Sequence, residues 1–355
     1  MTLDWRVFLL FFLLILVGGV GFMLYAMKRS EKGKATPEPP LTGKVYEVEL
    51  LGWVVYWDSK SEKRFVENAD KFTWVSPTWY EVNGNGDISE RGFSEKLIQV
   101  AREHGVKVVP LIANKGFSSE VGHRILADPE IREKVLEGIV KIVAEKNYDG
   151  INIDFEGIDP ADREALSRFI CDLSGRLHGL GKELSIDVPA KTRATYEGWS
   201  GAFDYAELAK CVDYLVIMIY DYHWSGGEPG PVSPLGWFRQ VLSYAVATVP
   251  KEKIVAGIPV YGYDWPAGGK GRGITYEDCV RQAELHGVEI SFDAESGEVT
   301  YKYESGGVLH EVWCNTAKSA ELRFEAALEY GINRIAFWRV GAEDPRFWSI
   351  IKRPG

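Results

Sequence analysis

The chain has 355 residues, 46% of them hydrophobic, with 41 Lys and Arg against 51 Asp and Glu. This composition excludes a disordered or collagen-like chain. The net charge of -10 argues against a sequence-independent nucleic-acid binder, because such a protein needs a basic face for the phosphates. The cysteines include no CxxC pair, so the sequence gives neither a zinc-ligand spacing nor a dense disulfide framework.

The N-terminus carries an apolar segment long enough to cross a membrane. Residues 7–27 contain no charge, and these 21 residues would rise about 31 Å as a helix. A cleaved signal peptide is the alternative, but its apolar region is usually about 7–15 residues and a small-x-small site follows it. We predict an uncleaved transmembrane anchor over residues 1–27 that contacts the lipid bilayer. Residues 28–44 are polar and Pro-rich, which predicts a semi-extended spacer.

The rest of the chain, residues 45–355, alternates short β-branched runs with helical stretches. This pattern is typical of a parallel sheet in an α/β fold. Helix starts are marked by Asp128-Pro129 and Asp159-Pro160, since Asp is a good N-cap and Pro fits the first helical position. We predict a (β/α)8 TIM barrel with strands at residues 50–56, 72–77, 106–112, 150–155, 183–189, 214–220, 254–260 and 334–338.

Residues 264–315 are too many for an ordinary connection between strands seven and eight. They include a helical stretch at 276–286 and strand-like runs at 289–292 and 299–303. We predict a small α+β insertion there. Cys279 and Cys314 bracket it, and either a disulfide in an oxidising compartment or two unpaired residues is compatible with the sequence. Cys171 and Cys211 lie at apolar helical or pre-strand positions and are expected to be core residues.

Candidate catalytic residues lie at the end of the fourth predicted strand. Period-two alternation places Asn152, Asp154 and Glu156 on one face, and a barrel of this kind has its active site at the C-terminal ends of the strands. Burying acids side by side is costly without partners. A salt-bridged strand would predict Lys or Arg on facing strand ends, but the sixth strand offers Met218, Tyr220 and Asp221. We therefore predict a functional site.

Two kinds of chemistry could use these carboxylates. A metal site would need three or more ligands including His, and the only His nearby is His223, so we predict no metal and no cofactor. A glycosidase needs one acid of raised pKa, and Glu156 is the natural donor. Asp154 cannot easily be the direct nucleophile from the same strand. The 2-acetamido oxygen of the sugar can attack instead.

The segment from Asp149 to Glu156 resembles the DxxDxDxE signature of glycoside hydrolase family 18, the chitinase family. Further motifs are similar to that family: Met218 to Asp221 on strand six, Ser76-Pro77 on strand two, and Trp338 on strand eight. The resemblance covers roughly residues 45–355. Within the family it looks closest to the bacterial and archaeal branch that includes spore-cortex and peptidoglycan N-acetylglucosaminidases.

The resemblance implies a role for each matching residue. Glu156 would act as general acid and then base, and Asp154 would orient the acetamide and stabilise the oxazolinium. Tyr220 would hydrogen-bond the acetamido oxygen, and Asp221 would contact the sugar or tune Glu156. Asp149 is out of register with the inward face and is expected to be structural. The anomeric configuration would be retained without a covalent enzyme adduct.

One position departs from the family pattern. Asn152 stands where many chitinases have an Asp whose carboxyl shares a proton with its neighbour. Our hypothesis from the sequence is that this coupling is absent here, so that Asp154 stays ionised and accepts the substrate acetamide N–H directly.

Several aromatic residues follow predicted strand ends. Flat rings stack against sugars, although a Trp can also simply be buried. The resemblance implies that Trp338 forms the floor of the −1 subsite. The other candidate substrate-binding residues are Trp57, Trp79, Trp224, Trp265 and Tyr222.

The sequence thus predicts a glycosidase that cleaves β-1,4 linkages after N-acetylglucosamine in chitin-like chains, peptidoglycan or a related surface polysaccharide. A non-catalytic, lectin-like relative is the alternative. A polymer-degrading site favours an extracellular domain. Lys28, Arg29, Lys32 and Lys34 follow the apolar segment and argue for the opposite orientation by the positive-inside rule.

Overall fold

The computed structural model describes residues 35–355, which form an α/β barrel with one insertion. The parallel strands of the barrel follow one another around it in chain order. They are β2 (Glu49–Val54), β3 (Trp74–Pro77), β6 (Lys107–Val108) with β7 (Leu111–Asn114), β8 (Gly150–Asp154), β9 (Glu183–Pro189), β10 (Tyr214–Met218), β11 (Ile254–Pro259) and β17 (Arg334–Trp338). The predicted TIM barrel is confirmed.

The third barrel position holds two short strands instead of the single predicted one. Pro110 separates β6 from β7, because proline has no N–H to give to a sheet. β6 pairs with β3 on one side and β7 pairs with β8 on the other, so the sheet closes through this break. The Pro110 carbonyl accepts a hydrogen bond from the backbone N–H of Asn152 at 2.9 Å. A hairpin of β4 (Tyr80–Val82) and β5 (Ile88–Glu90) extends the rim beside β7.

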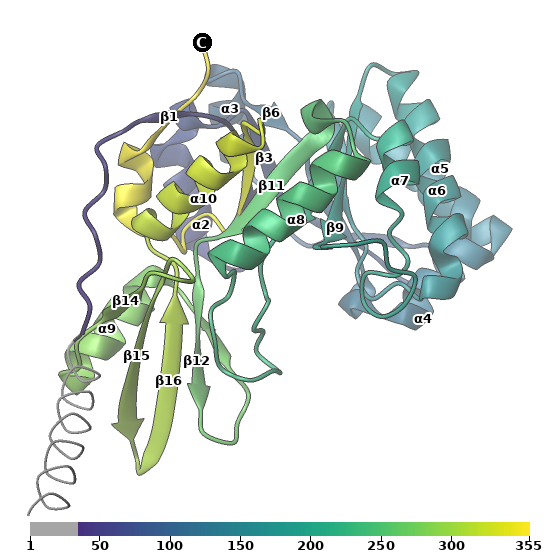
Figure 1. Cartoon of the computed structure of the whole chain (residues 1–355). Helices are drawn as coiled ribbons and strands as arrows, with labels where there is room; N and C mark the ends of the chain where they lie inside the picture. The colour runs from purple at the N-terminus through teal and green to yellow at the C-terminus, as the bar shows by residue number, and fades with distance from the viewer. Residues whose placement is uncertain (1–34) are drawn as a thin grey trace, which may run out of the picture.

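Helices surround the barrel (Figure 1). As predicted, Asp128 caps α5: its carboxylate accepts from the N–H groups of Glu130 and Ile131. The eighth helical position holds the 3-10 helix η5 (Pro345–Ser349) rather than an α-helix. The outer helices are α2 (Ser59–Glu67), α3 (Glu95–Glu103), α4 (Ser119–Ala127), α5 (Pro129–Glu145), α6 (Arg163–His178), α7 (Tyr205–Cys211), α8 (Leu235–Thr248) and α10 (Ala317–Glu329).

The insertion follows β11 and has its own antiparallel sheet, in the order β13-β12-β16-β15-β14. Its elements are β12 (Gly262–Pro266), β13 (Arg272–Ile274), α9 (Tyr276–His286), β14 (Ser291–Asp293), β15 (Glu298–Ser305) and β16 (Val308–Cys314). Figure 1 shows this sheet projecting from one end of the barrel. Because the insertion continues from the C-terminal end of β11, it lies on the side of the barrel mouth.

All four cysteines are paired. Cys279 and Cys314 join α9 to β16, with Cα atoms 6.6 Å apart. Cys171 and Cys211 join α6 to α7, with Cα atoms 5.0 Å apart. Cys171 and Cys211 were expected only to be core residues, and their bond was not predicted. Each sits on an apolar helical position, as the sequence indicated, but the sequence does not show that these two helices are neighbours.

The segment before the barrel lies against the domain rather than forming a free spacer. The Thr36 carbonyl accepts from the N–H of Phe292 at 2.7 Å, and the Thr42 N–H donates to Glu321 at 3.0 Å. Arg346 donates to Glu38 at 2.9 Å. Figure 1 shows this segment running along the outside of the molecule from the insertion to β1 (Tyr46–Glu47), which pairs with β18 (Ile351–Lys352).

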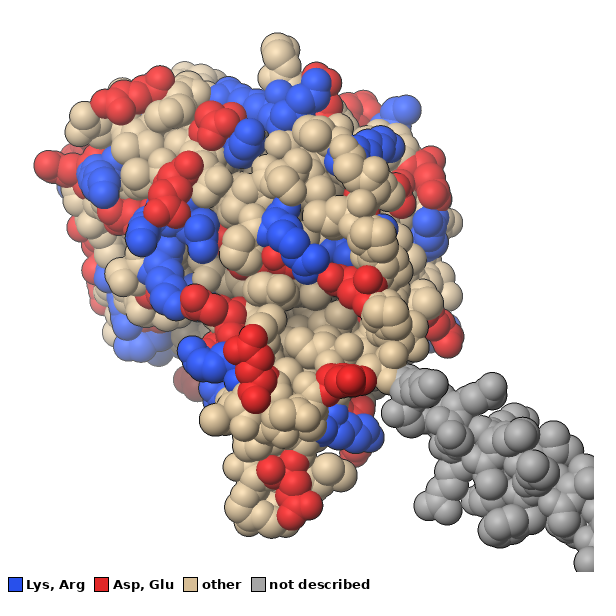
Figure 2. Space-filling model, turned by 90° about the vertical axis from the view of Figure 1, so that its left-hand side faces the viewer, with Lys and Arg blue, Asp and Glu red and all other residues tan. Residues whose placement is uncertain are grey.

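The predicted anchor over residues 1–27 and the first part of the spacer lie outside the described residues. Between residues 35 and 355, no helix combines the length and apolarity needed to cross a membrane. On the face shown in Figure 2, basic and acidic side chains are interspersed. This face thus offers no extended basic surface for a phosphate backbone.

Candidate active site

The candidate catalytic residues meet at the mouth of the barrel. Ile151, Ile153 and Phe155 are buried in the core between the barrel and its helices, so alternation along β8 turns Asn152 and Asp154 to the barrel interior. Glu156 follows the strand and is half-buried. The sequence pattern therefore places these three side chains as predicted.

Asn152 is the centre of a buried polar network beneath the mouth. Its Oδ1 accepts from Trp53 Nε1 at 3.2 Å and from Ser76 Oγ at 3.3 Å. Its Nδ2 donates to Ser185 Oγ at 3.1 Å and to Asp187 Oδ1 at 3.0 Å. These bonds join four barrel strands and use the full capacity of the amide, so its orientation is fixed.

Asp187, on β9, is a site residue that the sequence analysis missed. Asp154 and Asp187 are both buried, and burial raises the pKa of each; the charge of Asp187 adds to the rise for Asp154, and that of Glu156 to the rise for Asp187. Two like charges in such a place are not both ionised at neutral pH. The hypothesis that coupling is absent is therefore wrong. Asp187 supplies the second carboxyl that Asn152 lacks.

The two carboxyls of this pair differ in their hydrogen bonds. Asp187 accepts a hydrogen bond from the Asn152 amide, which favours its ionised form. Asp154 Oδ1 is buried and has no hydrogen-bond partner among the described residues. An ionised carboxylate at Asp154 would therefore cost more free energy than one at Asp187. The prediction that Asp154 stays ionised is corrected accordingly.

Glu156 has the environment of a general acid. Burial raises its pKa, with further contributions from Asp154 and Asp221, to about 9. Its backbone is held by Asn114 at the end of β7: Asn114 Oδ1 accepts from the Glu156 N–H, and Asn114 Nδ2 donates to the Glu156 carbonyl, both at 2.9 Å. Asn114 is a second residue that the sequence analysis missed. Only its position at a strand end could have indicated it.

Tyr220 and Asp221 come from the end of β10. Burial raises the pKa of the Tyr220 hydroxyl, and the surrounding Asp187, Asp154, Glu156 and Asp221 raise it further, which places it among all four carboxyls. Asp221 has a positive φ of 59°. Although this residue reaches solvent, its carboxylate accepts from the hydroxyls of Tyr261 and Tyr263. Burial of the carboxyl raises its pKa, and the two tyrosine hydrogen bonds lower it in part.

The two remaining supporting residues are Met218 and Asp149. Met218 ends β10 and pairs with Gly257 and Pro189 on the neighbouring strands. Asp149 accepts from the Val108 N–H at 2.8 Å at the start of β8, which fits the structural role predicted for it.

Comparison with known proteins identifies the family. The model of the family described as "Glycosyl hydrolases family 18" matches residues 52–343. The chain belongs to this family. The resemblance stated from the motifs is thus confirmed, and the family is one of enzymes that hydrolyse glycosidic bonds.

Individual relatives agree with this assignment. The chain is 32% identical over 251 residues to the cortical fragment-lytic enzyme of Bacillus subtilis strain 168, covering 69% of this chain and 58% of that enzyme. The crystal structure of the spore cortex-lytic enzyme SleL from Bacillus megaterium QM B1551 superposes with a TM-score of 0.80 at 30% identity, over 89% of this chain and 76% of that one. The crystal structure of a chitinase from Chromobacterium violaceum ATCC 12472 superposes with a TM-score of 0.80 at 28% identity, over 85% of this chain and 97% of that one.

The aromatic residues expected at the mouth of this family 18 domain divide into two groups. Trp79 and Trp265 are only 3% and 1% exposed, so neither offers a face to a sugar, and the prediction that they bind substrate is wrong. Both are taken up by core contacts, the alternative considered for any Trp. Trp57, Trp224 and Tyr222 are 56%, 56% and 52% exposed, and their substrate contacts stay a prediction.

Trp338 ends β17 and is partly buried in the barrel mouth. Its ring meets Trp53 edge-on, with centroids 5.9 Å apart. Trp53 in turn donates to Asn152. The ring predicted to carry the −1 sugar is therefore linked through one side chain to the carboxyl network.

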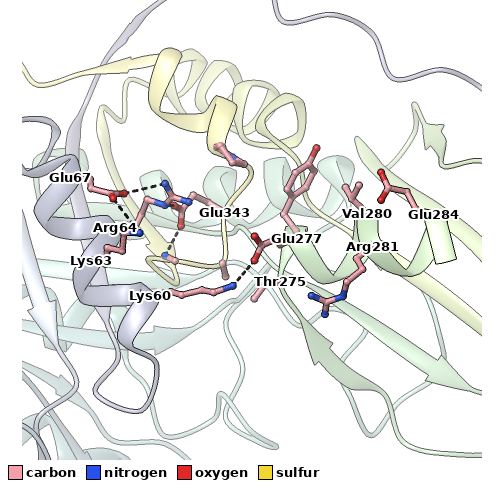
Figure 3. Close-up of a pocket in the computed structure, with 14 residues that line it drawn as sticks. Lys60, Lys63, Arg64, Glu67, Thr275, Glu277, Val280, Arg281, Glu284 and Glu343 are labelled. Atoms are coloured by element: carbon pink, nitrogen blue, oxygen red, sulfur yellow. Dashed lines mark hydrogen bonds and ion pairs between the residues drawn. The ribbon is translucent and has the colours of Figure 1, made fainter.

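A cavity of about 670 Å³ lies between α2 and α9, away from these residues (Figure 3). Its lining includes none of the candidate catalytic residues. Two ion pairs join charges of its lining: Lys60 with Glu277 at 2.5 Å and Arg64 with Glu343 at 3.0 Å. Within residues 35–355, no group of three or more His, Cys, Asp or Glu side chains is arranged to hold a metal ion.

Proposed function

We propose that this family 18 domain is a retaining glycosidase that cleaves β-1,4 linkages after N-acetylglucosamine with the help of the substrate's own acetamido group. The observation that carries this proposal is the buried, unpartnered Asp154 Oδ1 beside a Glu156 whose pKa is raised to about 9. The first is an acceptor suited to an acetamide N–H. The second is an acid that keeps its proton at neutral pH.

The proposed reaction has two steps. Glu156 gives its proton to the glycosidic oxygen while the acetamido oxygen attacks C1, so the C1–O bond breaks and an oxazolinium forms. Asp154 accepts the acetamide N–H, and the Tyr220 hydroxyl donates to the acetamido oxygen. Glu156, now a carboxylate, takes a proton from water as that water attacks C1. The ring opens back to the acetamide with retention, and Glu156 regains its proton.

The names of the relatives refer to two classes of polysaccharide substrate. The names of the spore enzymes refer to cortex, and the third relative is a chitinase. The chain spans 58% of the length of the Bacillus subtilis cortical fragment-lytic enzyme, so further parts of that protein have no counterpart in the match. We propose peptidoglycan or a chitin-like chain as substrate.

We further propose that residues 7–27 anchor the domain in the cell membrane with the barrel on the extracellular face. Two disulfides, Cys171–Cys211 and Cys279–Cys314, support this placement, because disulfides persist in oxidising compartments. The basic residues after the apolar segment argue the other way.

The test is product analysis by mass spectrometry. The full chain in detergent is incubated with N-acetylglucosamine oligomers and with purified peptidoglycan, beside Glu156→Gln and the control Glu145→Gln, which changes an exposed acid at the far end of α5. Cleavage by the wild type and the control, but not by Glu156→Gln, is expected. Binding of a glycan without cleavage by any variant would favour the lectin-like alternative and overturn the proposal.

A further inference from the structure

The insertion ends in a hairpin whose turn exposes aliphatic side chains. β15 and β16 are joined by Gly306 and Gly307, both at positive φ, 58° and 76°. Positive φ at both central residues is typical of the tight two-residue turn that matches the twist of paired strands. Val308 and Leu309, which follow the turn, are 38% and 52% exposed. The two glycines thus leave these aliphatic side chains at the tip.

The tip is the part of the hairpin that lies farthest from the barrel. At the near end, Val299 pairs with Cys314, which in turn pairs with Gly262, three residues after β11. Six residue steps lead from Val299 to Ser305 at the turn, or about 20 Å at about 3.4 Å per residue. Figure 1 shows β15 and β16 pointing away from the barrel over this length.

Two further segments reach the same end of the insertion. In the turn after β12, the Ala267 N–H donates to the Leu309 carbonyl at 2.8 Å. At the end of α9, His286 stacks on Tyr303 with centroids 4.2 Å apart, and its neighbour Leu285 is 75% exposed. Between residues 35 and 355, three of the six exposed Leu and Val side chains therefore form what we call the distal patch: Leu285, Val308 and Leu309.

The chain enters the described structure on this insertion. The Thr36 N–H donates to Ser291 Oγ at 2.9 Å and the Thr36 carbonyl accepts from the Phe292 N–H at 2.7 Å, so the chain is tied to β14, an edge strand. Nine residue steps separate Thr36 from Met27, the end of the predicted span, and reach at most about 32 Å when fully extended. The insertion is therefore the part of the domain that the predicted span would hold next to a bilayer.

A tethered surface needs little affinity of its own. Three partly exposed aliphatic side chains bind a lipid surface only weakly by themselves, but a linker raises their effective concentration at it. The exposed charges near the tip have both signs: Glu304 and Lys270 are exposed, and Lys302 pairs with Glu311 at 2.7 Å. A contact with the bilayer therefore does not depend on anionic lipid.

We propose that the distal patch contacts the lipid bilayer in which the chain is anchored. The insertion then stands between the membrane and the barrel and sets the height of the barrel mouth above the lipid. This inference rests on the proposed anchor and not on the proposed reaction, and it holds for either orientation of the chain. Lipid fits the patch better than a glycan does, because the patch is aliphatic and sugars stack on flat aromatic rings.

Quenching by lipid-attached nitroxide tests the contact. The four cysteines of the chain are all in disulfides, so Leu309→Cys adds the single free thiol for a fluorescent label. The labelled full chain is reconstituted in phosphatidylcholine vesicles with and without lipid that carries a nitroxide on its headgroup. We expect at least about twofold quenching, since side chains that lie on a membrane enter the headgroup boundary by about 5–10 Å.

Leu180→Cys is the matched control for the label. Leu180 is 49% exposed and precedes β9, at the end of the barrel opposite the mouth. Its label should not be quenched. Equal quenching at the two positions would show no preferred contact and overturn the proposal. Shielding of the Leu309→Cys label without nitroxide quenching would indicate a second copy of the chain on the patch and would also overturn it.

A second pair of variants removes the patch while keeping the label nearby. Glu304, which lies opposite Leu309, is changed to Cys with and without Val308→Asp and Leu309→Asp. Quenching should be at least about twofold weaker with the two aspartates, because a charge is costly to place among lipid chains. Hydrolysis of the N-acetylglucosamine hexamer in detergent should stay within about twofold, as expected for surface changes away from the site. Quenching that ignores the aspartates would refute the contact.

Sedimentation with the vesicles separates the possible failures. A full chain that stays in the supernatant would refute the anchor and the contact together. A chain that sediments with an unquenched Leu309→Cys label would refute the contact alone. A wild type that sediments but hydrolyses no substrate would refute the proposed reaction, and the quenching result would still decide the contact.

Discussion

At the scale of single residues, the site depends on a buried pair of carboxyls, Asp154 and Asp187, whose pKa values are both raised. Asn152 donates to Asp187 and so favours the anion there, whereas Asp154 Oδ1 has no donor among the described residues. The amide at position 152 thus does not remove the coupling between two carboxyls. It stabilises the ionised form of only one of the two.

Asp187→Asn should make the protein more stable at alkaline pH and less active. A carboxyl whose pKa is raised by folding binds more protons in the native state, so stability falls as pH rises above the unfolded value near 4. Removing Asp187 also removes the charge that raises the pKa of Asp154. We expect a Tm at pH 8 above that of the wild type, little change at pH 4, and a kcat lower by about 10- to 100-fold.

Thermal unfolding at both pH values and hexamer kinetics check this prediction. A lower Tm at pH 8 would contradict the shared-proton account.

Asp221→Asn should move the alkaline limb of kcat/KM to lower pH. Glu156 must be protonated to act as an acid, and the negative charge of Asp221 is one of the groups that raise its pKa. Without that charge, Glu156 loses its proton at a lower pH. The shift is less than about one pH unit, because the Glu156–Asp221 pair is partly solvated. The pH profile on the hexamer measures this, with Glu228→Gln in the same loop as control. If the alkaline limb of Asp221→Asn coincides with that of the wild type, Asp221 does not raise the pKa of Glu156 and only contacts the sugar.

The sequence was enough to predict that some of these residues belong to the site, but not others. Alternation along residues 150–156 was enough to orient Asn152, Asp154 and Glu156, because each strand residue has only two faces to choose from. The same rule applied to β9 would have turned Ser185 and Asp187 inward. Asn114 could not be found this way, since its amide acts on the backbone of a residue far along the chain.

At the scale of elements, the insertion supports the loop that carries Tyr220 and Asp221. Glu298 on β15 accepts from the N–H groups of Val232 and Ser233 at 2.9 Å and 2.6 Å. Arg323 on α10 pairs with Glu298 at 2.8 Å, and both side chains are fully buried. The loop after β10, which carries Tyr220 and Asp221, is thus fixed at its base between the insertion and the barrel.

Glu298→Ala should destabilise the protein by about 3–5 kcal/mol, because it leaves the charge of the buried Arg323 without its ion-pair partner. The double variant Glu298→Ala with Arg323→Met should regain part of that stability, since no charge is left buried. It should not regain kcat, because Val232 and Ser233 still lack their acceptor. Denaturant unfolding and hexamer kinetics on both variants check this. Recovery of stability and kcat together would show that the loop needs no such support.

The regular elements were the most predictable part of the fold. The bounds of β9, β17 and α9 agree with the runs expected from the sequence, because period and capping are local properties. What depends on a distant neighbour was not predictable. The Cys171–Cys211 bond follows from which helices lie side by side. The division at Pro110, by contrast, could have been predicted from the sequence, because proline has no N–H to give to a sheet.

At the scale of the whole molecule, the route of the chain relates the predicted anchor to the barrel mouth. Thr36 pairs with Phe292 in the insertion, and the insertion lies on the mouth side. The chain therefore enters the described structure beside the mouth and not at the opposite end, where β1 and β18 pair. If residues 7–27 cross a bilayer, the barrel mouth with its active site faces that membrane and the polymer next to it.

The anchor itself can be tested in the full chain. We expect the wild type to stay in the membrane pellet after alkaline carbonate extraction. A variant with Leu14→Arg and Leu16→Arg should be released, since each Arg near the centre of a span costs about 2.5–3.5 kcal/mol of insertion free energy. Protease added to intact cells should then reach the barrel of the wild type if it is extracellular. Complete protection would place the barrel in the cytoplasm, as the basic residues after the span predict. In that case a polymer outside the cell could not be the substrate.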